Sequence, residues 1–206
     1  MLLKISSKEV SQRSIAKVVE CLKSGGVIIY PTDSVYGMGC DLYNHKAVER
    51  ICLIKGIRPE KSNFSILCHD LSNLSEYSKQ IDTPLYKIMK RALPGPFTFI
   101  LPATNLVPKL FKSRKKTIGI RVPDNIIVST IIKELGNPLV STSIYDDDAI
   151  LEYASIPEEI HEKYKKTVDI VIDGGPGHKT PTTVVDCSGG SIQIIRQGLG
   201  NLDEYR

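Results

Sequence analysis

Hydroxyl-bearing and basic side chains recur at or beside the ends of short apolar runs in this sequence. Thr32 and Ser34 follow the run 27–30, and Arg121 lies near the end of the run 117–122. Ligands of open α/β sheets bind at strand ends, and hydroxyl and guanidinium groups match carboxylate and phosphate oxygens geometrically. The pattern therefore predicts a cleft for an anionic ligand, with a purely structural role as the alternative. The other residues of the pattern are Arg58, Lys61, Thr117, Ser141, Ser143 and Arg196.

A second concentration of charge lies between two of the apolar runs. Five cations fall within eight residues, in a chain of net charge +4 and pI near 8.7. Such a segment contacts phosphates when it borders a binding face, and otherwise only solvates a turn. The five cations are Lys109, Lys112, Arg114, Lys115 and Lys116.

Several familiar kinds of site are not supported. The segment 174–180 (GGPGHKT) is only superficially a Walker A loop, because His178 replaces the glycine before Lys179 and Pro181 replaces the following helix. The five cysteines form no CxxC pair, so neither a zinc ribbon nor a thioredoxin-like site is indicated. We therefore predict no metal site, and the residues identify no catalytic nucleophile.

Hydrophobic periodicity predicts the elements that would position these residues. Helices and strands alternate early and strands cluster late, so we expect an α/β fold on a mixed sheet. Helices are expected at 10–23, 45–55, 82–93, 125–135 and 157–166. Strands are expected at 27–30, 63–68, 97–101, 117–122, 138–143, 168–172, 183–187 and 191–196.

The bulk properties are those of an ordinary globular protein. The 206 residues, 41% hydrophobic and 24% charged, suit a single domain spanning 1–206. No apolar run approaches the roughly 18 residues of a membrane span, and the N-terminus lacks the apolar core of a signal peptide. Unpaired cysteines within apolar runs suit a reducing compartment. We therefore expect a cytoplasmic protein with no membrane segment.

Six segments, in order, resemble the motifs of one known family. The first, 24–37 (SGGVIIYPTDSVYG), is an apolar strand followed by P-T-[DE]-[ST]-x-Y-G. The others are 93–99 with P-G-P-x-T, 118–123 with R-x-P, 141–143 with S-T-S, 174–186 with GG and PTTVVD, and 195–198 with IRQG. On these motifs the chain is similar to the YrdC/YciO family of threonylcarbamoyl-adenylate synthase-like proteins.

The resemblance implies both a fold and an activity. The fold would be a YrdC-like α/β domain, with a twisted mixed sheet, flanking helices and a concave, positively charged face. The activity would be nucleotidyl transfer, in which L-threonine, bicarbonate and ATP give threonylcarbamoyl-adenylate and pyrophosphate for tRNA N6-threonylcarbamoyladenosine modification. Mg²⁺ would accompany ATP. Family members have also been described as binding double-stranded RNA, so tRNA or another structured RNA is an expected partner.

The resemblance also implies roles for residues. L-threonine would be held by Ser34, Arg121 and Ser141. ATP would be contacted by Lys55, Arg58, Lys61, Thr117, Ser143 and Arg196. No covalent nucleophile is implied, because the carbamate oxygen attacks the α-phosphate, and positioning and charge neutralisation carry most of the rate.

Two departures from the family pattern leave the function open. Active enzymes of the family carry K-x-R, whereas this chain reads KGIR at 55–58. They also carry S-x-N, whereas Tyr145 stands here at the asparagine position. Both departures resemble the YciO branch. The alternatives are therefore a synthase, a binding protein for structured RNA such as tRNA or the ribosome with little or no catalysis, and a nucleotide-binding protein with another small substrate.

Overall fold

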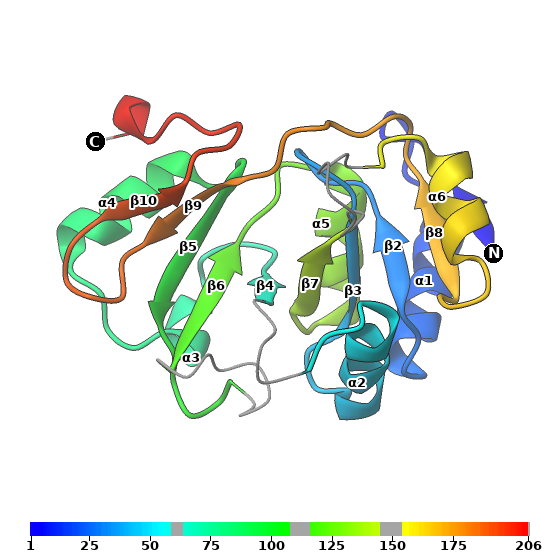
Figure 1. Cartoon of the computed structure of the whole chain (residues 1–206), viewed down its shortest axis with the longest axis horizontal. Helices are drawn as coiled ribbons and strands as arrows, with labels where there is room; N and C mark the ends of the chain where they lie inside the picture. The colour runs from blue at the N-terminus through cyan, green and yellow to red at the C-terminus, as the bar shows by residue number, and fades with distance from the viewer. Residues whose placement is uncertain (59–63, 108–115, 145–153, 206) are drawn as a thin grey trace.

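A mixed β-sheet forms the body of the protein (Figure 1). The computed structural model describes residues 1–58, 64–107, 116–144 and 154–205. Over these residues the sheet has ten strands, in the order β1-β8-β2-β3-β7-β4-β6-β5-β9-β10. The strands are β1 Leu2–Lys4, β2 Ile28–Tyr30, β3 Gly37–Asp41, β4 Ser65–Leu67, β5 Phe97–Pro102, β6 Thr117–Arg121, β7 Leu139–Ser143, β8 Ile170–Asp173, β9 Thr183–Asp186 and β10 Gln193–Arg196.

Helices cover both faces of this sheet (Figure 1). They are α1 Gln12–Lys23, α2 His45–Ile54, α3 Leu74–Tyr77, α4 Thr83–Ala92, α5 Ile126–Leu135 and α6 Pro157–Tyr164, with a 3₁₀ turn, η3, at Leu202–Tyr205. Parallel pairs such as β4–β6 and antiparallel pairs such as β5–β6 occur in the same sheet. The predicted α/β fold on a mixed sheet is therefore confirmed, whereas the positive charge of a concave face stays a prediction.

Two hydrophobic clusters hold the helices to the sheet. On one face, Ile15 of α1 and Ile131 of α5 are buried with Ile28 of β2 and Leu139 of β7. On the other face the helices α2, α4 and α6 bury their apolar sides in the larger cluster. On β5, Phe97, Phe99 and Leu101 are buried in this cluster, while the alternate side chains are only half-buried. Since successive strand residues point to opposite faces, β5 leaves one face partly open.

Small residues line up across the middle of the sheet. Gly39 of β3 is opposite Ser141 of β7, Ser141 is opposite Ser65 of β4, and Ser65 is opposite Gly119 of β6. Partners in register share a face, so these four positions form one row. A Cβ at Gly119 would lie 3.1 Å from the Thr98 methyl group, which leaves little room for a larger residue there.

The predicted elements all have counterparts within a few residues of their expected bounds. Two strands, β1 and β3, were not predicted. β3 reads GMGCD, and its two glycines hide the alternation that identifies a strand. It is a strand because β2 and β7 pair with it on either side.

The structure also bears on two expectations from composition. In the part of the chain that is described, no helix is long and apolar enough to cross a membrane. Cys52 and Cys68, which stand in apolar runs, are buried as expected, and Cys40 and Cys187 are buried as well.

Candidate functional site

Arg121, the last residue of β6, gathers the residues that follow β2. Its Nη2 donates to Thr32 Oγ1 and Ser34 Oγ, each at 2.9 Å, and forms an ion pair with Asp33 Oδ1. The Arg121 and Asp33 side chains are only 8% and 10% exposed. The tertiary fold thus joins residues almost ninety positions apart into one buried polar cluster.

Thr32 fixes the shape of the turn after β2. Its Oγ1 accepts from the Ser34 backbone N–H at 3.0 Å and donates to the Val35 carbonyl at 2.8 Å. The two hydroxyl oxygens of Thr32 and Ser34 are 3.2 Å apart. Because the turn is closed by its own side chains, both hydroxyls are held next to the guanidinium of Arg121.

Tyr30, two residues before Thr32, is hydrogen-bonded to Ser141. Its Oη donates to Ser141 Oγ at 2.7 Å, and both side chains are buried. Burial raises the pKa of Tyr30, while the hydrogen bond with Ser141 and the charge of Arg121 act in the opposite direction. The ring crosses β3 over two glycines, since a Cβ at Gly37 would lie 3.0 Å from the ring and one at Gly39 would lie 2.9 Å from the hydroxyl.

The three residues predicted to hold L-threonine therefore lie in one region. Ser34 and Arg121 are in direct contact, and Ser141 is hydrogen-bonded to Tyr30, which stands two residues before Thr32 in the chain. Sequence reasoning did not select Asp33 or Tyr30. Asp33 stands inside the PTDS motif, but an aspartate is itself an anion and does not belong to a pattern of anion-binding side chains.

Two of the residues predicted to contact ATP lie side by side. Lys55, which follows α2, donates from Nζ to the backbone carbonyl of Ser143 at 3.2 Å. Ser143 is the last residue of β7, two positions beyond Ser141. Thr117, the first residue of β6, is buried at 9% exposure. The lysine that is out of register with the family motif is thus in contact with the strand that carries Ser143.

The two predicted ATP-binding arginines are both exposed. Arg196, the last residue of β10, donates from Nε and Nη2 to the Thr182 carbonyl at 3.2 and 3.0 Å, and from Nη2 to Thr182 Oγ1 at 3.1 Å. Arg58 lies at the edge of the described range 1–58. Lys61 and Tyr145 lie outside the described residues. ATP and Mg²⁺ binding therefore stay predictions.

Most of the predicted RNA-binding segment lies outside the described residues, namely Lys109, Lys112, Arg114 and Lys115. Lys116 directly precedes β6 and has a positive φ of 57°. Its carbonyl accepts from the Ala103 N–H at 2.9 Å, next to the pairing of β5 with β6. RNA contact by this segment stays a prediction.

The segment 174–180 contributes to the site in a way unlike a phosphate loop. Tyr36 Oη donates to the Gly175 carbonyl at 2.7 Å and accepts from Gly174 N–H at 3.2 Å. The His178 N–H donates to the Ser34 carbonyl at 3.2 Å. Burial raises the pKa of Tyr36 to about 12, so its hydroxyl keeps its proton at neutral pH. These hydrogen bonds hold the segment 174–180 against Ser34, the residue that contacts Arg121.

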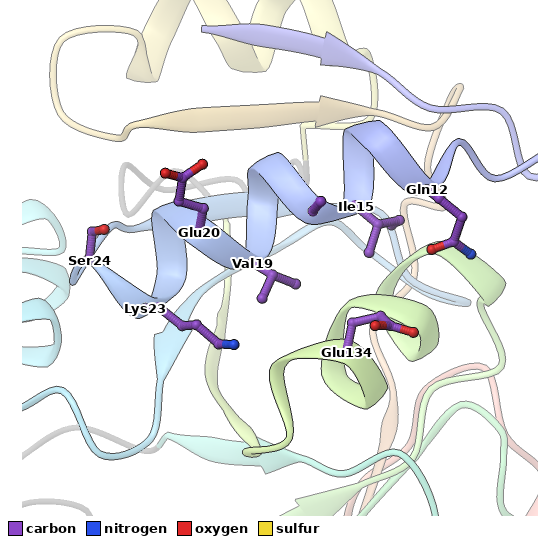
Figure 2. A pocket seen from close by; sticks show the side chains of 8 residues that line it. Gln12, Ile15, Val19, Glu20, Lys23, Ser24 and Glu134 are labelled. Atoms are coloured by element: carbon purple, nitrogen blue, oxygen red, sulfur yellow. The ribbon is translucent and has the colours of Figure 1, made fainter.

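A separate groove of about 440 Å³ lies between α1 and α5 (Figure 2). Ile15 and Val19 of α1 line it, and Figure 2 shows Lys23 and Glu134 on the two helices that flank it. None of the predicted site residues lines this groove. The candidate site is therefore the Arg121 cluster.

Comparison with known sequences identifies a family. The family model Sua5/YciO/YrdC, described as "Telomere recombination", matches residues 20–198. YciO of Escherichia coli (strain K12) is 42% identical over 196 residues, which are 94% of this chain and 93% of YciO. A threonylcarbamoyl-AMP synthase of Methylobacillus flagellatus is 32% identical over 171 residues, which are 83% of this chain and 93% of that protein.

Solved structures agree with the sequence match. The crystal structure of E. coli YciO has a TM-score of 0.92 at 40% identity, over 100% of this chain and 99% of YciO. The crystal structure of P. abyssi Sua5 with L-threonine has a TM-score of 0.90 at 23% identity, over 99% of this chain and 59% of Sua5, and shows a likeness of fold. The chain belongs to the Sua5/YciO/YrdC family.

Proposed function

We propose that this chain is a threonylcarbamoyl-adenylate synthase, which joins L-threonine, bicarbonate and ATP and releases pyrophosphate, in the service of tRNA N6-threonylcarbamoyladenosine modification. The observation that carries the proposal is the buried contact of Arg121 with Thr32 and Ser34. A guanidinium held rigidly beside two hydroxyls suits a carboxylate. Relatives of this chain include threonylcarbamoyl-AMP synthases, and a Sua5 of the same fold was crystallised with L-threonine.

Three groups would bind the carboxylate end of L-threonine. Arg121 would supply the positive charge, and Ser34 and Ser141 would supply hydroxyl donors. Because the Tyr30 O–H already donates to Ser141 Oγ, the proton of Ser141 is directed elsewhere and is available to a ligand oxygen. Tyr30 is thus a positioning residue for Ser141.

The chemistry requires two bond-forming steps. The threonine amine, having lost a proton, adds to the carbon supplied by bicarbonate, and water leaves to give a carbamate. A carbamate oxygen then attacks the α-phosphate of ATP, and the bond to pyrophosphate breaks. The protein would contribute position and charge neutralisation. The residues proposed for the phosphates, where Mg²⁺ would add positive charge, are Lys55, Arg58, Lys61, Thr117, Ser143 and Arg196.

One assay tests this function. Pyrophosphate release from ATP, with bicarbonate present, is measured with and without L-threonine, and the adenylate product is identified by mass. We expect threonine-dependent release by the wild type and a loss of about 10- to 150-fold in kcat/KM for Arg121→Ala, the factor that a hydrogen bond to a charged group supplies. Lys23→Ala, in the α1–α5 groove, is the matched control for loss of a cation. A wild type whose release does not depend on threonine contradicts the proposal.

The second candidate function is binding of structured RNA, such as tRNA, double-stranded RNA or ribosomal RNA, with little or no catalysis. It is favoured by Lys55, which contacts the Ser143 carbonyl instead of matching the K-x-R spacing, and by Tyr145 at the asparagine position. Duplex RNA binding by a wild type that releases no pyrophosphate would support this candidate over the synthase.

A further inference from the structure

Two polar atoms of the Arg121–Asp33 ion pair have no hydrogen-bond partner. Arg121 makes its contacts in this cluster through Nη2, whereas its Nε is buried and unpartnered. Asp33 receives Arg121 at Oδ1, whereas its Oδ2 is buried and unpartnered. In the described part of the chain, His161 Nδ1 is the one other side-chain atom in this condition. Buried polar groups are nearly always hydrogen-bonded, so two such atoms in a single pair require an explanation.

The two atoms require opposite partners. Arg121 Nε is a donor and needs an acceptor, and Asp33 Oδ2 is an acceptor and needs a donor. A ligand with only a negative charge would be attracted by Arg121 and repelled by Asp33. A ligand with only a positive charge would be attracted by Asp33 and repelled by Arg121. An α-amino acid carries a carboxylate and an ammonium on one carbon. It therefore supplies the acceptor and the donor together.

We propose that Asp33 is a specificity-determining residue, whose Oδ2 accepts a hydrogen bond from the ammonium group of an α-amino acid while Arg121 Nε donates to its carboxylate. This inference rests on the proposed function and names the feature by which the site selects its substrate. The neighbouring hydroxyls support it, because Thr32 and Ser34 hold Arg121, and Arg121 in turn fixes Asp33 through Oδ1. Hydrogen bonds between charged groups are the stronger ones, so this contact provides selectivity.

An ordered water is the competing partner for these atoms, since water both donates and accepts. The two explanations differ in what they predict for ligands. A water-filled site gives no advantage to an amino acid over the matching hydroxy acid. A site in which Asp33 binds the ammonium favours the amino acid strongly.

The test compares two ligands by calorimetry. L-Threonine and the 2,3-dihydroxybutanoate of the same stereochemistry differ only in an ammonium replaced by a hydroxyl. We expect the wild type to bind threonine about 10- to 150-fold more tightly, the factor of one charged hydrogen bond. Asp33→Asn should lose that factor for threonine and bind dihydroxybutanoate as well as, or better than, the wild type.

Asp41→Asn is the matched control for loss of a buried carboxylate. Asp41 is 8% exposed, lies at the far end of β3, and accepts from Tyr43 N–H at 2.9 Å and from Asn137 Nδ2 at 3.0 Å. The Asp41→Asn substitution should leave the affinities for threonine and for dihydroxybutanoate unchanged. The free energy of unfolding of each variant, measured in urea, shows whether either substitution acts on the fold.

Equal wild-type affinity for the two acids overturns the inference, and this comparison needs no variant to fold. Unchanged threonine affinity in Asp33→Asn overturns it as well. The outcome is separable from the proposed function. A wild type that prefers threonine but releases no pyrophosphate contradicts the synthase and leaves the role of Asp33 in place. A working synthase that binds the hydroxy acid equally well contradicts the role of Asp33 alone.

Discussion

The hydrogen bond between Tyr30 and Ser141 predicts an unusual order of stabilities. Tyr30 is fully buried and donates to Ser141 Oγ at 2.7 Å. Tyr30→Phe keeps the ring over Gly37 and Gly39 and removes the bond; Ser141, whose hydroxyl is left behind, is 5% exposed, whereas Tyr30 is fully buried, so the cost should be about 0.5–1.5 kcal/mol. Ser141→Ala leaves the Tyr30 hydroxyl buried without a partner, which should cost about 1–3 kcal/mol. The serine variant should therefore be the less stable of the two.

The double variant sharpens this prediction. Tyr30→Phe in the Ser141→Ala background removes the unpartnered hydroxyl, so the double variant should be more stable than Ser141→Ala alone. The free energy of unfolding from urea denaturation measures all four proteins, and the double-mutant cycle gives the coupling between the two sites. Tyr36→Phe serves as the control, because the hydroxyl that it removes contacts backbone atoms of 174–175. Its effect on the free energy of unfolding should be additive with that of Ser141→Ala. Additive costs in the Tyr30 and Ser141 pair would refute the reasoning.

Three further predictions concern function. Arg58→Ala and Arg196→Ala should each weaken ATP binding by about 1.5–3 kcal/mol in calorimetry, and wild-type affinity in both variants contradicts their assignment to phosphate. Tyr145→Asn should raise threonine-dependent pyrophosphate release, whereas an unchanged rate means that this position does not limit activity. Removing three cations of the basic segment should reduce the slope of log K for duplex RNA binding against log salt concentration. The reduction should be roughly one unit per lost phosphate contact, while ATP binding stays nearly intact. That variant combines Lys112→Ala, Arg114→Ala and Lys115→Ala, and a salt slope equal to that of the wild type would mean that these cations only solvate a turn.

The amphipathic and apolar segments were predictable because their signals are local. The helix α1 has Ile15, Val18 and Leu22 on one side, and Ser11 caps it by accepting from the Ser14 N–H. The strand β2 is a short β-branched run that ends at a proline. Periodicity and breaking residues are properties of the sequence itself, so tertiary contacts were not needed to locate these elements.

Ser34 and Arg121 could be selected as candidates from the sequence because they stand at or just beyond the ends of recognisable strands. Their mutual contact was not predictable from spacing. It depends on the sheet order, which places β3, β7 and β4 between β2 and β6. Strand order depends on long-range pairing, and no local pattern in the sequence encodes it.

The sequence alone determined most of the strands and helices and which side chains at their ends were candidates for binding an anion. Only the tertiary structure decided how those side chains are paired. Asp33 could not be selected from its motif, because a carboxylate becomes part of an anion-binding site only where an arginine neutralises it. Arg121 reaches Asp33 from 88 residues further along the chain, and one carboxylate oxygen and the arginine Nε are left buried without a partner. Hydrogen-bond satisfaction depends on distances and burial in three dimensions, which residue types and spacing do not specify.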